Sequence, residues 1–232
     1  MSTVPPYPEG HGLLEGRWVL VTAAAGTGIG FATARRCAEE GARVILSDRH
    51  ERRLAEAADQ LEEITRTRPP AIPCDVTREA EVQNLFERAT AAAGGRIDVV
   101  VNNAGLGGTA LLVDMTDEQW NAVLDVTLNG TFRCTRAALR HMIPNRRGVV
   151  VNNASVLGWR AQAGQAHYAA AKAGVMALTR CAAMEAAPAG VRVNAVAPSL
   201  AMHPFLTKVT SGEVLEELVK REAFGRAAEP WE

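Results

Sequence analysis

A serine, a tyrosine and a lysine are spaced in this sequence as proton transfer to or from an alcohol or ketone requires. Tyr168 and Lys172 lie four residues apart in an alanine-rich stretch, 165–186, that is predicted to be helical, so they share one face. An ammonium beside a phenol favours the phenolate and lowers a pKa that is otherwise about 10. Tyr168 is therefore a candidate acid and base, and Ser155 a candidate hydrogen-bond donor to the substrate oxygen. The structural alternative is a helix-surface Tyr–Lys pair with an unrelated turn serine.

A glycine-rich turn, Thr22 to Gly30, lies between a predicted strand and a predicted helix. Glycines allow the backbone to approach a pyrophosphate, and the helix N-terminus offers unpaired N–H groups to it. Asp48, after the next strand, would accept the adenosine ribose hydroxyls and repel a 2′-phosphate, whereas Arg49 would attract one. We therefore expect NAD rather than NADP; simple turn glycines and a solvated carboxylate are the alternatives. The turn residues expected at the cofactor are Thr22, Ala24, Gly26, Thr27, Gly28 and Ile29.

Composition limits the class of protein. The chain has 232 residues, 47% of them hydrophobic, which suffices for one or two domains with a sizeable core. Its net charge of -1 argues against nucleic acid or an anionic membrane as partner, and no apolar run reaches the roughly 18 residues of a membrane span. The N-terminus has no signal-peptide pattern, and the four cysteines are widely spaced, so a reduced cytoplasmic location is expected. We predict no metal site.

Apolar strands alternate with helices along the whole chain. Because these strands are continuous apolar runs, they predict an α/β fold whose parallel sheet is covered by helices on both faces. No linker interrupts the pattern, so we predict a tail over 1–16 and one doubly wound domain over 17–232. Thr116 opens one helix with a capping box. The predicted strands are 17–22, 43–47, 71–74, 97–101, 149–151 and 191–196, and the predicted helices 28–40, 50–66, 78–93, 116–142 and 165–186.

One short motif occurs twice. The stretch Val99 to Gly105 (VVVNNAG) is repeated as Val149 to Ser155 (VVVNNAS). We interpret the two copies as strands that end at the same level of the sheet, with asparagines at their carboxyl ends. Ligands of open α/β sheets bind beyond these ends, so the repeat indicates where the chemistry should occur. A structural similarity without functional meaning is the alternative.

Taken together and in this order, the motifs resemble those of the short-chain dehydrogenase/reductase family. They are the glycine-rich turn, Asp75-Val76, Asn102-Asn103-Ala104-Gly105, Ser155 and Tyr168-x-x-x-Lys172, and they span nearly the whole chain. The resemblance implies a Rossmann fold, with Asp75 and Val76 flanking the adenine and Asn103, Ala104 and Gly105 supporting the sheet and the cofactor. It also implies that Tyr168 is the acid and base, that Ser155 positions the carbonyl, and that Lys172 holds the nicotinamide ribose.

Two departures from the family pattern concern the cofactor turn and the proton relay. The glycine turn is one residue longer than usual and has alanines in place of its first glycine, so its geometry should differ. Thr127 occupies the position of the family's catalytic asparagine. Asn129 cannot replace it, because two residues rotate a helical side chain by about 200°. The family's relay water also uses the backbone carbonyl at this position, which Thr127 keeps, so we expect a modified but functional relay.

Further departures follow the sixth strand. The family has Pro-Gly and then a threonine that contacts the nicotinamide amide, whereas this chain has Pro198-Ser199-Leu200 and, later, His203. His203 would replace the threonine or be an ordinary loop histidine. The resemblance also implies one more helix and an edge strand, which this sequence lacks. A homotetramer or homodimer is implied, with helices 116–142 and 165–186 at an interface.

The family resemblance also implies that the segment 200–224 forms a mobile lid over the substrate, and its residues make this lid apolar. Such a lid favours a bulky alicyclic or acyl substrate over a sugar, unless its apolar residues only pack the lid onto the domain. The expected substrate contacts are Ser155, Leu157, Trp159 and Phe205. The stretches 21–30, 152–162 and 224–231 also resemble reductases of bacterial steroid-ring breakdown, a branch of lipid metabolism. Those enzymes act on CoA thioesters of a hydroxylated or keto methyl-hydrindane acid.

Two other functions are considered. A 3-oxoacyl-[acyl-carrier-protein] reductase usually has an arginine in the glycine turn for NADPH, where this chain has Thr27. A non-catalytic NAD(H)-binding sensor is suggested by Thr127 and by the missing C-terminal elements, but the intact set of Ser155, Tyr168 and Lys172 argues against it. Enoyl reduction is disfavoured, because the family's enoyl reductases space the tyrosine and lysine more widely.

Overall fold

The computed structural model describes residues 4–203, 206 and 212–232. Six parallel strands form one sheet in the order β3-β2-β1-β4-β5-β6, which confirms the predicted doubly wound α/β fold. The strands are β1 (Trp18–Thr22), β2 (Arg43–Asp48), β3 (Ala71–Pro73), β4 (Val99–Asn102), β5 (Gly148–Asn153) and β6 (Val191–Val196). The long helices are α1 (Ile29–Glu39), α2 (Glu51–Thr65), α3 (Glu79–Ala92), α4 (Asp117–Leu124), α5 (Gly130–Met142), α6 (Ala166–Ala186) and α8 (Gly212–Lys220).

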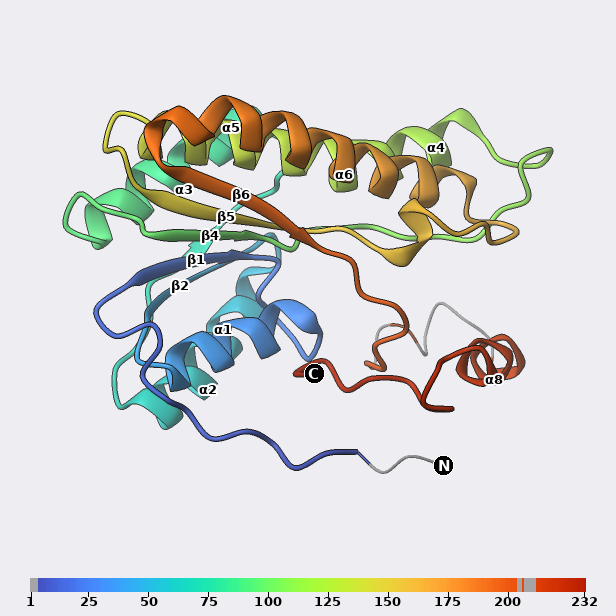
Figure 1. Ribbon diagram of the computed structural model, residues 1–232, viewed down its shortest axis with the longest axis horizontal. Helices are drawn as coiled ribbons and strands as arrows, with labels where there is room; N and C mark the ends of the chain where they lie inside the picture. The colour runs from blue at the N-terminus through green and yellow to red at the C-terminus, as the bar shows by residue number, and fades with distance from the viewer. Residues whose placement is uncertain (1–3, 204–205, 207–211) are drawn as a thin grey trace.

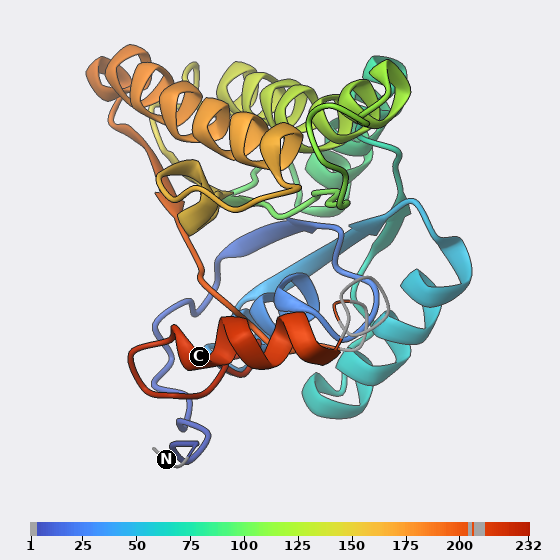
Figure 2. The same ribbon diagram turned by 90° about the vertical axis from the view of Figure 1, so that its right-hand side faces the viewer.

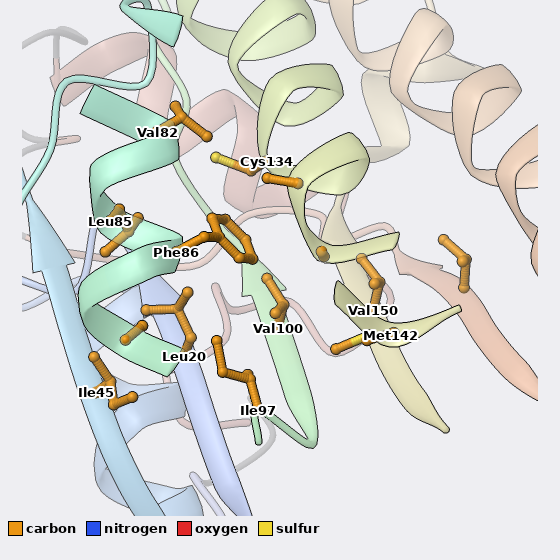
Figure 3. Packing of buried hydrophobic residues seen from close by; sticks show 14 of the residues in the cluster. Leu20, Ile45, Val82, Leu85, Phe86, Ile97, Val100, Cys134, Met142 and Val150 are labelled. Atoms are coloured by element: carbon orange, nitrogen blue, oxygen red, sulfur yellow. The ribbon is translucent and has the colours of Figure 1, made fainter. Parts of the chain in front are cut away.

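Helices cover both faces of the sheet. Figure 1 shows α1 and α2 on one face and α3, α5 and α6 on the other. Successive side chains of a strand point to opposite faces, so Val19 and Val21 of β1 pack with α1 and α2, whereas Leu20 packs with α3 and α5. In Figure 3, Leu20 lies beside Phe86 of α3, and Met142 lies farther along this same core. This two-sided burial explains why the strands are continuous apolar runs.

The helix predicted over 116–142 is interrupted. Thr116 caps α4 with the predicted capping box, but a π-helical turn, Asp125–Asn129, separates α4 from α5. The Gly130 amide donates to the Asp125 carbonyl five residues earlier, and the extra residue changes which side chains face the core. Such π turns are frequent at functional sites. The apolar periodicity gave no indication of it, because a single inserted residue leaves both flanking helical patterns intact.

The N-terminal segment predicted as an extended tail is anchored to α1. The amides of His11 and Leu13 both donate to the Glu40 carboxylate, at 2.8 and 3.0 Å. The Arg36 side chain donates to the Pro8 and Glu9 carbonyls. These contacts join residues about 30 positions apart, so a pattern read along the sequence does not reveal them.

The residues after β6 form a loop closed at its base. Ala201 and Ala228 form a parallel β-bridge, in which the Met202 amide donates to the Ala228 carbonyl at 2.9 Å. Figures 1 and 2 both place α8, the helix within this loop, on the same side of the sheet as α1. Farther on, Trp231 makes an edge-to-face contact with Tyr7 at 5.1 Å between ring centroids. The C-terminal segment therefore packs against the N-terminal one.

Candidate active site

The two asparagine pairs of the repeated motif meet at the carboxyl ends of β4 and β5. Asn102 and Asn152 are paired in register, and the Asn102 amide donates to the Asn152 side-chain oxygen at 2.9 Å. The Asn152 amide donates in turn to Thr179 on α6 at 2.9 Å. The prediction that both copies end at one level is confirmed. The two strand ends thus supply hydrogen-bond partners for the buried amide nitrogens of Asn102 and Asn152.

Helix α6 carries Tyr168 and Lys172 to this edge of the sheet. The Lys172 amine lies 5.5 Å from the centroid of the Tyr168 ring and donates to the Asn153 carbonyl at 2.5 Å. Ser155 lies just after β5; its side chain is hydrogen-bonded to Tyr168 and accepts the Leu157 amide at 3.2 Å. The structure thus brings together the three residues singled out first in the sequence.

Burial shifts the pKa values of Lys172 and Tyr168. Lys172 is 3% exposed, and loss of solvation lowers its pKa to about 8. Burial also raises the pKa of Tyr168, and the hydrogen bond with Ser155 opposes this effect only in part. The sequence-based expectation of a lowered tyrosine pKa is therefore wrong for this arrangement. The spacing placed the amine one turn away, but it did not reveal that the lysine is buried and the tyrosine half-buried.

Thr127 lies in the π turn with its side chain fully buried. Its hydroxyl accepts the Leu106 amide at 3.0 Å and donates to the Leu106 carbonyl at 3.1 Å, so it fixes the loop after β4. Its backbone carbonyl, expected to contact a relay water, accepts the Thr131 hydroxyl at 2.8 Å. Asn129 is exposed and bonded to Asp125, away from the Thr127 position, as the rotation argument predicts.

The glycine turn has the features that a pyrophosphate needs. Gly28 is the N-cap of α1 and makes no side-chain capping bond, and no acidic residue stands in the first turn of the helix. A Cβ at Gly26 or Gly28 would meet no atom within 4 Å, so the backbone there is open to approach. A Cβ at Gly30 would lie 2.2 Å from the Ala23 carbonyl oxygen, so that glycine is required for packing. The turn therefore fits a dinucleotide, because uncapped N–H groups at the start of a helix can bind phosphate.

Thr22, at the end of β1, is hydrogen-bonded to the turn that follows β4. The Thr22 hydroxyl accepts the amides of Asn103 and Ala104, at 3.0 and 3.2 Å. Ala24 is fully buried, Thr27 is exposed and Ile29 is half-buried. Gly105 lies close to Lys172, because a Cβ there would be 3.6 Å from the amine.

Asp48, Arg49 and Asp75 lie where the adenosine is expected. The Asp48 carboxylate accepts the Ala25 amide at 3.2 Å and the His50 amide at 3.0 Å, which fixes it beside the glycine turn. A cavity of about 330 Å³ is lined by Arg49, His50, Glu51, Pro73, Cys74, Asp75 and Glu81. Val76, expected at the adenine, is 7% exposed, packs close to Gly130 and is not among the residues that line this cavity.

The segment after β6 borders the site. The Pro198 carbonyl accepts the Val156 amide at 3.1 Å, which ties this segment to the residue after Ser155. Ser199 donates to Glu222 at 2.5 Å, and the Leu200 carbonyl accepts the Ala228 amide. His203 is half-buried, and burial lowers its pKa. Phe205 lies outside the described residues.

The substrate side of the site is open. Leu157 is half-buried in a short 3₁₀ turn, Val156–Gly158, and Trp159 is 72% exposed beside it. A second cavity, of about 210 Å³, lies between α4, the loop 106–110 and His167. The sequence interpretation missed His167. It directly precedes Tyr168, is 2% exposed and accepts the Tyr168 amide at 2.9 Å; that adjacency was the available signal.

Within the described part of the chain, no helix is long and apolar enough to span a membrane. The same residues contain no group of three or more His, Cys, Asp or Glu side chains that could hold a metal ion.

Comparison with known proteins identifies the family. A family model described as short chain dehydrogenase matches residues 17–213. The chain is 60% identical over 233 aligned positions, covering 100% of this chain and 88% of the relative, to a (5R,7aS)-5-hydroxy-7a-methyl-1-oxo-2,3,5,6,7,7a-hexahydro-1H-indene-carboxyl-CoA reductase of Mycobacterium tuberculosis. It is 39% identical over 219 residues to a 3-oxoacyl-[acyl-carrier-protein] reductase of Thermotoga maritima, covering 94% of this chain and 87% of the relative.

A solved structure agrees with this assignment. The crystal structure of a short chain dehydrogenase from Mycobacterium smegmatis is 56% identical and superposes with a TM-score of 0.87, covering 99% of this chain and 87% of that one. The backbone of the whole chain thus closely matches that of a solved short chain dehydrogenase. The chain belongs to the short-chain dehydrogenase/reductase family and is a nicotinamide-dependent oxidoreductase that interconverts alcohols and ketones.

Proposed function

We propose that this protein is an NAD-dependent reductase or dehydrogenase that interconverts a ring hydroxyl and a ring ketone on an alicyclic CoA thioester of the hydrindane type. The observation that carries the substrate proposal is the 60% identity, over the whole chain, to the hydroxy-methyl-oxo-hexahydroindene-carboxyl-CoA reductase of M. tuberculosis. Two exposed apolar side chains of the lid, Val214 and Phe224, support a bulky apolar substrate.

The residues divide the reaction as follows. When bound, the nicotinamide cofactor supplies or takes up the hydride. In the reducing direction Tyr168 donates a proton to the ketone oxygen, and burial keeps its phenol protonated for this step. Ser155, beside Tyr168, donates a second hydrogen bond to the same oxygen. Lys172, fixed through the Asn153 carbonyl, holds the nicotinamide ribose.

The cofactor is held by the glycine turn, Asp48 and the segment Pro198 to His203. Asp48 supports NAD over NADP, because its fixed carboxylate would repel a 2′-phosphate. Thr127 acts by holding the loop after β4 in place. The proposal includes a cytoplasmic role in bacterial steroid-ring breakdown and assembly as a homotetramer or homodimer through α4, α5 and α6.

The substrate proposal is tested by an NADH-linked assay on two substrate series. Hydroxy-hydrindane CoA esters should generate NADH, whereas simple 3-hydroxyacyl-CoA esters should react much more slowly. Turnover of the simple esters alone would contradict the proposal and favour the acyl-carrier-protein reductase. Tyr168→Phe is the control for chemistry: it should lower turnover by about 10²–10⁴-fold and leave NADH binding intact. A protein that acts as a sensor would show no turnover before the substitution.

A further inference from the structure

Asn153 connects three parts of the site. It is the last residue of β5, two positions before Ser155. Its side-chain amide donates to the Asn103 side-chain oxygen at 2.8 Å, across to the turn after β4. Its backbone carbonyl accepts the Lys172 amine at 2.5 Å. One residue therefore contacts both the turn that borders the cofactor and the lysine beside Tyr168.

The hydrogen bonds of this connection run in one direction. The Asn103 nitrogen donates to the Ala23 carbonyl at 3.1 Å, and a carbonyl can only accept. The Asn103 side-chain oxygen must then point toward Asn153, which has to present its own N–H group to it. We call this chain, from Asn153 through Asn103 to Ala23, the amide brace. Its orientation is fixed at the Ala23 end.

The amide brace contacts the glycine turn at Ala23, where the backbone is strained. Ala23 has a positive φ of 49°, a conformation that costs a residue with a Cβ more than it costs glycine. The first turn of α1 rests directly on the brace, because a Cβ at Gly30 would lie 2.4 Å from the Asn103 side-chain nitrogen. A shift of Asn103 would therefore move both the strained turn and the uncapped start of α1, the two features that fit a pyrophosphate.

The brace has a cost in folding stability. The side-chain oxygen of Asn153 is buried and accepts no hydrogen bond from any described residue. A buried acceptor without a donor destabilises a fold, and an aliphatic side chain of similar size avoids that cost. An asparagine here is thus poorly explained by stability, whereas its amide donor has a defined task. Local violations of the packing rules are expected at functional sites.

We propose that Asn153 is a positioning residue: through the amide brace it holds the glycine turn in place and so sets the affinity for the nicotinamide cofactor. Lys172 contacts only the backbone carbonyl of this residue, which every substitution keeps. Loss of the side chain should therefore weaken cofactor binding more than it slows the chemical step. The proposal rests on the proposed function only for the choice of NADH as probe, because binding is measured without substrate.

The test compares Asn153→Leu with a matched control in α6, at the residue that Asn152, the neighbour of Asn153 in β5, contacts. Asn153→Leu removes the donor, keeps the branch at Cγ and should raise the Kd for NADH, measured by calorimetry, about fivefold or more. Its melting temperature should change little, because the substitution removes the unpaired oxygen of Asn153 and leaves the oxygen of Asn103 unpaired instead. Thr179→Val, which deletes the hydroxyl that Asn152 contacts, should lower the melting temperature and leave the Kd unchanged. At saturating NADH, the kcat of Asn153→Leu should change less than its Kd.

Non-additivity gives a second, independent readout. If both asparagines act through one brace, Asn103→Leu combined with Asn153→Leu should weaken NADH binding no more than Asn103→Leu alone. Asn153→Ala serves in place of Asn153→Leu if the larger side chain prevents folding. An unchanged Kd in either Asn153 variant overturns the proposal. So does an equal loss of affinity in Thr179→Val, which would make Asn153 one structural residue among others. Failure of the hydrindane substrates leaves both readouts untouched.

Discussion

Lys172 carries its amine into the interior beside Tyr168, where it donates to a backbone carbonyl and faces little water. Lys172 is buried and Tyr168 is half-buried, and loss of solvation shifts each toward its neutral form: the lysine pKa falls to about 8 and the tyrosine pKa rises. The residue types were evident from the sequence, but the direction of the tyrosine shift was not. At the residue scale, desolvation outweighs the attraction that a spacing of four residues predicts.

The buried lysine predicts a specific dependence of stability on pH. Because the pKa of Lys172 is about 8 in the folded protein and about 10.5 in the unfolded chain, the unfolded chain binds more protons between these pH values. Stability should therefore rise with pH across this window. The difference in unfolding free energy between the protein and its Lys172→Met variant should shift by about 3 kcal/mol in favour of the lysine from pH 7.5 to 10.5. Urea unfolding without cofactor measures it, and a constant difference would contradict the buried lysine.

At the scale of elements, the π turn between α4 and α5 decides what Thr127 does. The turn places this side chain in the core, where its hydroxyl makes both an accepted and a donated bond to Leu106. In a regular helix from 116 to 142, the residues after the π turn would point in a different direction relative to the core. The loop after β4, which leads to the cavity beside His167, is thus fixed by an interruption of a helix.

This arrangement is testable with one pair of substitutions. Thr127→Val keeps the shape but leaves the Leu106 amide and carbonyl without their partner. The free energy of unfolding should fall by about 1–3 kcal/mol, and turnover should fall with it. Thr127→Ser keeps the hydroxyl and should retain most of the stability and most of the turnover. Chemical denaturation and steady-state assays measure the two effects; a valine variant as stable and active as the serine variant would show that the hydroxyl does not hold the loop.

At the scale of the whole molecule, the proposed cofactor site is assembled from elements far apart in the chain. The glycine turn follows β1, Asp48 ends β2, Asp75 follows β3, and Lys172 comes from α6. The parallel sheet brings these segments to one edge, because all its strands run in the same direction. The two chain ends also meet, through the contact between Tyr7 and Trp231.

Cofactor choice is the prediction that depends on this assembly. The Asp48 carboxylate is held by two backbone amides next to the turn, so a 2′-phosphate would meet a fixed negative charge. Calorimetric titration should show tighter binding of NADH than of NADPH. Asp48→Asn should reduce the difference between the Kd values for NADH and NADPH, since it removes the charge and keeps the size of the side chain. Equal or tighter binding of NADPH by the unaltered protein would contradict this assignment and make Arg49 the dominant residue.

The sequence by itself determined the class of fold and the family. Continuous apolar strands alternating with helices predicted the parallel sheet, and the order of the motifs around Ser155, Tyr168 and Lys172 indicated the oxidoreductase. Both kinds of signal are local, because the pattern of a buried strand or of one helix face can be recognised within about 20 consecutive residues. Element ends were less accurate: β4 begins at Val99 rather than at 97, and β5 extends to Asn153 rather than to 151.

Only the tertiary structure decided how these residues act. It produced the π turn at Thr127, the anchoring of the N-terminal segment on Glu40, and the amide brace from Asn153 to Ala23. Each depends on groups that are 20 to more than 100 positions apart, and on the requirement that buried polar atoms find partners. The sequence lists those atoms, but packing alone determines which of them meet and how far water is excluded from them.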